Sequence, residues 1–96
     1  MHFEWNEAKR IGNICKHDID FIDCRAVFAG PTVTMPDDRV DYGETRYITL
    51  GLLSGRVVAI AHTESPDLIR IISARKAARH EQTYFFIGIS NVSDPD

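Results

Sequence analysis

The stretch Leu68–Phe86, LIRIISARKAARHEQTYFF, decides how this chain folds. It opens with the β-branched residues Ile69, Ile71 and Ile72, which favour a strand. At Ala74 the composition changes to Ala, Arg, Lys, Glu and Gln, which favour a helix. The stretch therefore predicts a strand over 68–74 that leads directly into a helix.

Positive charge gathers around this change from strand to helix. Arg70, Arg75, Lys76 and Arg79 lie within it, and Glu81 is the one nearby acid. A run of charges is most often only a solvated helix surface. Cations in the first turn of a helix are slightly unfavourable against the helix dipole, however, so we expect this cluster to serve a polyanionic ligand.

Length and composition place the chain among small globular proteins. Its 96 residues are 44% hydrophobic and carry a formal charge of −3, which indicates one domain, assigned to residues 1–86, followed by a flexible tail at 87–96. No apolar run reaches the roughly 18 residues of a membrane span, so we expect a cytoplasmic protein that does not contact membranes. The acids at Asp37, Asp38, Asp41 and Glu44 form a patch expected to lie apart from the basic cluster.

The rest of the chain gives short elements in the order β-α-α-β-β-β-β-α. Asn6 and Asp20 are predicted N-caps of two helices, and Gly30 a left-handed C-cap. In the first helix, Ala8, Ile11 and Cys15 recur at helical spacing, with Asn13 on the polar side. The predicted strands before the last one are 2–5, 32–35, 45–53 and 56–64. The fold class is therefore α+β, an antiparallel sheet packed by two N-terminal helices and followed by a C-terminal helix.

A tight hairpin at Ser54-Gly55 predicts which residues share a face of the sheet. It pairs Leu52 with Val57, and each earlier residue of strand 45–53 with the corresponding later residue of strand 56–64. This gives one apolar face, to which Ile69 and Ile71 are expected to belong. The opposite face would then carry four polar or aromatic residues as neighbours: Tyr47, His62, Glu64 and Arg70. A slip of one residue would separate them.

These neighbours are candidates for chemistry, although each also has a structural interpretation. His62 is either a half-buried residue or a proton shuttle, because its ordinary pKa is near neutral. Arg70 either pairs with Glu64 or binds phosphate, which guanidinium matches with two parallel hydrogen bonds. Cys15 and Cys24 are expected to be small buried hydrophobes, and the Cys and His spacing matches no standard metal site.

Two long motifs resemble those of the BrnT toxin family. FEWNEAKRIGNICKHDIDF at the start resembles the family's FEWDxxKxxxNxxKHG(V/I)xF, and RIISARKAARHE resembles RIISAR(K/R)AxxxE. Between them, Glu44 and Arg46 match an E-x-R element, and His62-Thr63-Glu64 stands where the family has its H-T element. The likeness extends from about Phe3 to Tyr84. Asn6 and Asp18 stand where the family usually has Asp and Gly.

The resemblance implies a RelE-like fold and a toxin of a type II toxin–antitoxin system that cuts RNA and blocks translation. Its implied partner is a BrnA-like ribbon-helix-helix antitoxin, through which the complex would bind promoter DNA. We expect a metal-independent endoribonuclease without cofactors, in which the 2′-hydroxyl attacks the phosphate and leaves a cyclic phosphate. The alternative is a module that binds RNA or protein without cutting. Expected roles are proton transfer by His62 or Glu64, stabilisation of charge by Arg70 and Arg75, stacking by Tyr47, and binding of flanking phosphates by Arg79 and Lys16.

Overall fold

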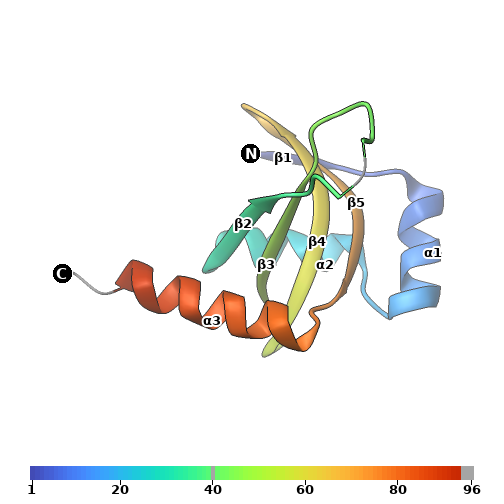
Figure 1. Ribbon diagram of the computed structural model, residues 1–96. Helices are drawn as coiled ribbons and strands as arrows, with labels where there is room; N and C mark the ends of the chain where they lie inside the picture. Colours follow the sequence, from blue (N-terminus) through green and yellow to red (C-terminus); the bar gives the residue numbers. More distant parts are fainter. Residues whose placement is uncertain (40, 94–96) are drawn as a thin grey trace.

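The computed structural model describes residues 1–39 and 41–93 and shows the predicted α+β class and element order. A five-stranded sheet is combined with three helices (Figure 1). The elements are β1 His2–Glu4, α1 Glu7–His17, α2 Phe21–Ala29, β2 Thr32–Pro36, β3 Tyr47–Leu53, β4 Arg56–Ser65, β5 Leu68–Lys76 and α3 Arg79–Ser93.

The strands lie in the order β1-β5-β4-β3-β2. The pairs formed by β2 to β5 are antiparallel, whereas β1 runs parallel to β5, so the sheet is mixed. Helix α2 lies behind the sheet and α3 crosses in front of it, while α1 packs mainly on β5 (Figure 1). We call the two sides of the sheet the α2 face and the α3 face.

Local sequence signals set the helix boundaries largely as predicted. The Asn6 side chain accepts a hydrogen bond from the Lys9 amide at 3.0 Å, and Asp20 accepts one from the Ile22 amide at 2.9 Å. Both satisfy amides that the first turn of a helix leaves unpaired. The prediction for Gly30 was wrong: it is extended at φ −101°, and the left-handed C-cap belongs to Asp18, which ends α1 at φ 58°.

The orientation of α1 also differs from the prediction. Ile11 and Cys15 are exposed, whereas the polar Asn13 is buried. Asn13 is the residue whose side chain bonds to backbone groups of β5 and of the turn after α1. A buried amide with its hydrogen bonds made is tolerated in the interior, so polarity alone misassigned this helix face. Cys24 is buried as predicted.

The β3–β4 hairpin follows the predicted register. Ser54 and Gly55 have φ of 52° and 79°, the left-handed values that a two-residue hairpin turn requires. Leu52 pairs with Val57, and Tyr47 pairs with His62.

The predicted division of the sheet into one apolar face and one reactive face was wrong, because helices cover both faces. Phe21, Cys24 and Val27 of α2 pack against Val58, Ile60, Ile69 and Ile71 on the α2 face. Phe85 of α3 packs against Ile48, Leu50 and Ala59 on the α3 face. Ile69 and Ile71 therefore lie opposite the aliphatic side chains with which they were expected to share a face.

The change from strand to helix comes later than predicted. Strand β5 continues through Arg75 and Lys76, and α3 begins at Arg79. Arg75 and Lys76 therefore belong to the strand and not to the first turn of the helix, where they were expected. At the other end, α3 includes residues 87–93 of the predicted tail, and its Ile89 packs against the α3-face core. Residues 94–96 of the predicted tail lie outside the described residues.

Candidate active site

His62 lies within the α2-face core. Its side chain is 0% exposed and packs between Phe28 and Tyr47, with ring centroids 5.1 and 5.9 Å away. Its Nε2 is hydrogen-bonded to Thr49 Oγ1 at 2.7 Å, while Nδ1 lies 3.7 Å from Glu64 Oε1, beyond hydrogen-bonding distance. Burial lowers the pKa of His62, a shift that the charge of Glu64 opposes only in part. The imidazole is therefore neutral and shielded at pH 7.

Arg70 does not lie beside His62, and the predicted juxtaposition of these residues was wrong. The β4–β5 turn contains only Pro66 and Asp67, so His62 pairs with Ile71 and Arg70 pairs with Thr63. Neighbouring residues of a strand point to opposite faces. Arg70 consequently projects on the α3 face. The turn has two residues instead of the three, 65–67, that the predicted strands leave between them. This difference of one residue places the Arg70 side chain on the other face of the sheet.

Arg75 projects on the α3 face as well, because it pairs with Ala59 of the α3-face core. Its guanidinium donates to both oxygens of Glu81, from Nη1 to Oε1 at 2.7 Å and from Nη2 to Oε2 at 3.1 Å. Glu81 Oε1 also accepts the Ala78 amide at 2.8 Å, which caps the start of α3. Hydrogen bonding by Arg75 is the main cause of a lowered Glu81 pKa, so this carboxylate is ionised at neutral pH.

The loop between β2 and β3 borders the same site. Its Asp37, with a side chain only 2% exposed, accepts two hydrogen bonds from Arg39 at 2.7 and 3.1 Å and one from the Tyr42 hydroxyl at 3.3 Å. The charges of Asp37 and Arg39 both act on the pKa of Arg75, so the loop lies near that guanidinium. Asp37, one acid of the patch expected to lie apart from the basic cluster, therefore lies near Arg75 of that cluster.

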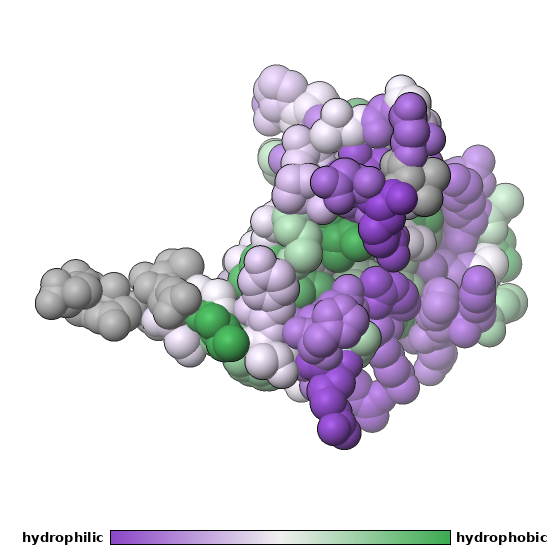
Figure 2. Space-filling view, viewed as in Figure 1, coloured by the Kyte–Doolittle hydropathy of each residue, from purple (hydrophilic) through white to green (hydrophobic). Residues whose placement is uncertain are grey.

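Arg46 completes this border. Its guanidinium lies 4.0 Å from the centre of the Tyr42 ring and donates from Nε to Glu44 at 2.9 Å. Figure 2, which views the α3 face, shows hydrophilic side chains around a hollow with apolar atoms at its base. The α3 face thus combines three arginines, the three carboxylates that pair with them and an apolar floor.

The other predicted residues are divided between locations. Lys16 lines a small hollow of about 440 Å³ together with Arg75, so these two candidates do lie together. Arg79 is exposed at the first position of α3. Tyr47 and Glu64, by contrast, accompany His62 on the α2 face.

Sequence reasoning missed Asp37 and Arg39 as neighbours of Arg75, and Tyr42 as a hydrogen-bond partner of Asp37. Their contacts depend on how a ten-residue loop folds back, and loop geometry of this kind leaves no periodic pattern. The E-x-R element was the available signal, since its Glu44 and Arg46 form one of the ion pairs that border the site.

Among residues 1–39 and 41–93, no three His, Cys, Asp or Glu side chains are grouped so that they could hold a metal ion. Within the same ranges, none of the helices has the length and apolar character needed to cross a bilayer.

Comparison with known families identifies one match. The family model of BrnT, the ribonuclease toxin of type II toxin–antitoxin systems, matches residues 5–81. Comparison with curated proteins gives no match. The matched segment contains Arg75 and Glu81 together with the whole β2–β3 loop.

Proposed function

The chain belongs to the BrnT family of ribonuclease toxins of type II toxin–antitoxin systems, and from that premise we propose that it cleaves RNA at Arg75 and Glu81 on the α3 face. It is a toxin whose target is RNA and whose partner is an antitoxin. The observation that carries the proposal is the two-point ion pair between Arg75 and Glu81, with side chains 35% and 12% exposed.

The burial of the two candidate regions favours the α3 face. A general base must reach the proton that it removes, directly or through one water molecule. His62 has no exposed surface in this structure. Glu81 keeps a free acceptor direction: an ionised carboxylate accepts about four hydrogen bonds, and this one accepts three. Burial therefore excludes His62. The Glu64 side chain is 42% exposed, but among the described residues it has no ion pair with an arginine that could stabilise the transition state, so we assign the proton transfer to Glu81.

In the proposed reaction, Glu81 accepts the proton of the 2′-hydroxyl while that oxygen attacks the neighbouring phosphorus. The bond from phosphorus to the 5′-oxygen breaks, water protonates the leaving oxygen, and a 2′,3′-cyclic phosphate remains. Arg75 stabilises the added negative charge of the transition state, which a fixed guanidinium does without reorganisation. A guanidinium already in place supplies the charge that a metal ion would otherwise provide, so we propose a metal-independent reaction.

Flanking phosphates are assigned to Arg70, Arg79 and Lys16. Arg70 is five residues from Arg75 along β5, or about 16 Å at the usual strand rise. It would therefore contact a phosphate farther along the RNA, not the one next to the reacting phosphate. Lys16 shares a hollow with Arg75, and Arg79 is on the first turn of the adjoining helix.

The cellular role that we propose follows the family. Cleavage of RNA in the cytoplasm would inhibit translation, and a BrnA-like ribbon-helix-helix protein would neutralise the toxin. The protein's formal charge of −3 disfavours direct binding to DNA. Binding of the complex to promoter DNA is accordingly assigned to the antitoxin. A small ribbon-helix-helix protein encoded beside this toxin would support that assignment.

The test is cleavage of a single-stranded RNA by purified protein in excess chelator. We expect fragments with cyclic phosphate ends, a fall in kcat of about 10²- to 10³-fold in Arg75→Ala, and a fall of about 10²- to 10⁴-fold in Glu81→Gln. Lys9→Ala is the control, because Lys9 is exposed on α1 away from the site. Thermal unfolding of each variant separates loss of chemistry from loss of fold.

Two outcomes would contradict the proposal. Activity that disappears with EDTA and returns with magnesium or manganese would show that a metal ion is required. Loss of cleavage in a folded His62→Gln variant, with Glu81→Gln active, would return the chemistry to the α2 face. Binding of RNA that stays intact at all enzyme concentrations would favour the non-catalytic module.

A further inference from the structure

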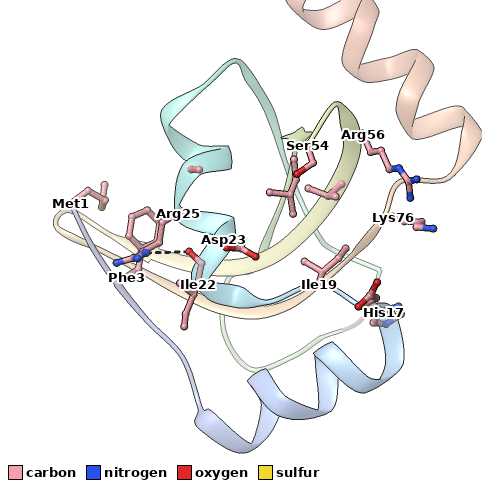
Figure 3. A pocket seen from close by; sticks show the side chains of 14 residues that line it. Met1, Phe3, His17, Ile19, Ile22, Asp23, Arg25, Ser54, Arg56 and Lys76 are labelled. Atoms are coloured by element: carbon pink, nitrogen blue, oxygen red, sulfur yellow. Dashed lines mark hydrogen bonds between the residues drawn. The ribbon is translucent and has the colours of Figure 1, made fainter.

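A second hollow, larger than the one beside Arg75, lies away from the α3 face. It has a volume of about 1000 Å³ and lies between α2, the end of α1 and the β3–β4 hairpin (Figure 3). Apolar side chains, among them Phe3 and Ile22, form part of its lining. Arg56, Lys76 and Arg25 supply positive charge, and Asp18 and Asp23 supply negative charge.

Among the described residues, Arg56 and Lys76 of this hollow have no carboxylate partner. Arg39, Arg46 and Arg75 of the α3 face, by contrast, are each paired with an acid. An unpaired cation can bind a phosphate without first breaking an internal salt bridge, so it contributes more of its interaction to the ligand.

Strand register places Arg56 close to Lys76. Lys76 pairs with Val58, and Arg56 is two residues before Val58, so all three project on the α2 face. Two residues of strand span about 7 Å. Figure 3 shows Arg56, Lys76 and His17 at one end of the hollow and Arg25 at the other.

This end of the hollow leads to the active site. The smaller hollow shares His17, Asp18 and Lys76 with the larger one, and its remaining lining includes Lys16 and Arg75. The two hollows therefore adjoin one another, and together they extend from Arg75 past the end of β5 to Arg56; we call the pair the path. The Lys, Arg and Asp side chains that line the larger hollow carry a formal charge of +1, in a protein whose formal charge is −3.

We propose that this path binds the single-stranded RNA that flanks the cleaved phosphate, with Lys76 and Arg56 on successive phosphates and the apolar lining against a base. The proposal rests on cleavage at Arg75. The two aspartates make the path selective, because they disfavour phosphates outside the positions that the cations neutralise.

The experiment compares the double variant Arg56→Ala/Lys76→Ala with the wild-type protein in two assays. The first is fluorescence anisotropy with a 2′-O-methyl RNA of about 12 nucleotides, which cannot be cleaved by 2′-hydroxyl attack. We expect a fall in affinity of about tenfold and a salt-dependence slope lower by about 1.4, since each single-strand phosphate contact contributes about 0.7. Lys9→Ala should change neither quantity.

The second assay measures turnover of a ribodinucleotide, which is too short to enter the path. The double variant should cleave it as fast as the wild-type protein, while its KM for a long RNA rises. Unchanged affinity and salt slope for the 2′-O-methyl RNA would overturn the proposal. They would do so even if the double variant had lost its binding to the antitoxin. If neither the wild-type protein nor the double variant cleaves the dinucleotide, the result counts against cleavage at Arg75. Failure of the RNA path and failure of the proposed function are therefore distinguishable.

Discussion

Asn13 offers the sharpest test of how the fold positions the active-site arginine. Its Nδ2 donates to the carbonyls of Ile19 and Ala74, each at 2.9 Å, and its Oδ1 accepts the Ala74 amide at 3.1 Å. Asn13 is buried, and Ala74 immediately precedes Arg75. One side chain thus satisfies both backbone groups of Ala74 where α1 meets β5.

Replacing Asn13 by Ala removes three hydrogen bonds at about 1 kcal/mol each, so we expect a loss of about 3 kcal/mol in the free energy of unfolding. For a domain of this size that is a fall in Tm of about 12–24 °C. Urea unfolding followed by circular dichroism measures the free energy directly. The control Lys9→Ala should change it by less than about 0.5 kcal/mol, as is usual for exposed positions.

Asn13→Asp sharpens this test because it keeps the size and the acceptor while removing both donors. At neutral pH it should destabilise at least as much as Asn13→Ala, since an ionised carboxylate would lie against two carbonyl oxygens. Its burial should raise the carboxyl pKa in the folded state, so the variant should recover stability relative to the wild type as pH falls. The reasoning fails if Asn13→Ala costs less than about 1 kcal/mol, or if Asn13→Asp is as stable as the wild type at pH 7.

Two further predictions concern the packing and titration of the α2 face. Gly51→Ala would place a Cβ 2.4 Å from Val27 Cγ1, so we expect α2 to be displaced and about 1–3 kcal/mol to be lost in urea unfolding; a Tm within 1 °C of wild type would contradict the close approach. His62 has a lowered pKa in the folded state, so the unfolded chain binds the proton more readily and stability should fall as pH drops below about 6.5. A series of Tm measurements from pH 7.5 to 5.5 should show this slope in the wild-type protein and a weaker slope in His62→Gln, and equal slopes would refute it.

The order of elements, two helix starts and the β3–β4 hairpin were predictable because each depends on residues near one another in the chain. Asn6 and Asp20 cap helices through contacts two or three residues away. Ser54 and Gly55 set the hairpin register by their own backbone conformation. Family membership was also predictable, since it rests on long motifs within the matched residues.

The placement of the candidate site was less predictable, because it depends on the exact length of one turn. Pro66 and Asp67 form a two-residue turn, and that single-residue difference moved Arg70 away from His62 to the α3 face. The change from strand to helix was recognised, but its boundary was not. Strand pairing keeps Arg75 in β5, where its side chain lies within reach of Glu81.

Taken alone, the amino-acid sequence determined the α+β class, the order of the elements and the family, because local conformation and motif spacing are properties of neighbouring residues. Only the tertiary structure decided that Asn13 is buried, that His62 is shielded and that the Asp37–Arg39 pair lies near Arg75. The physical reason is that burial and charge environment depend on long-range packing. A polar residue can be core if its hydrogen bonds are made, and a loop can bring its charges to a distant strand.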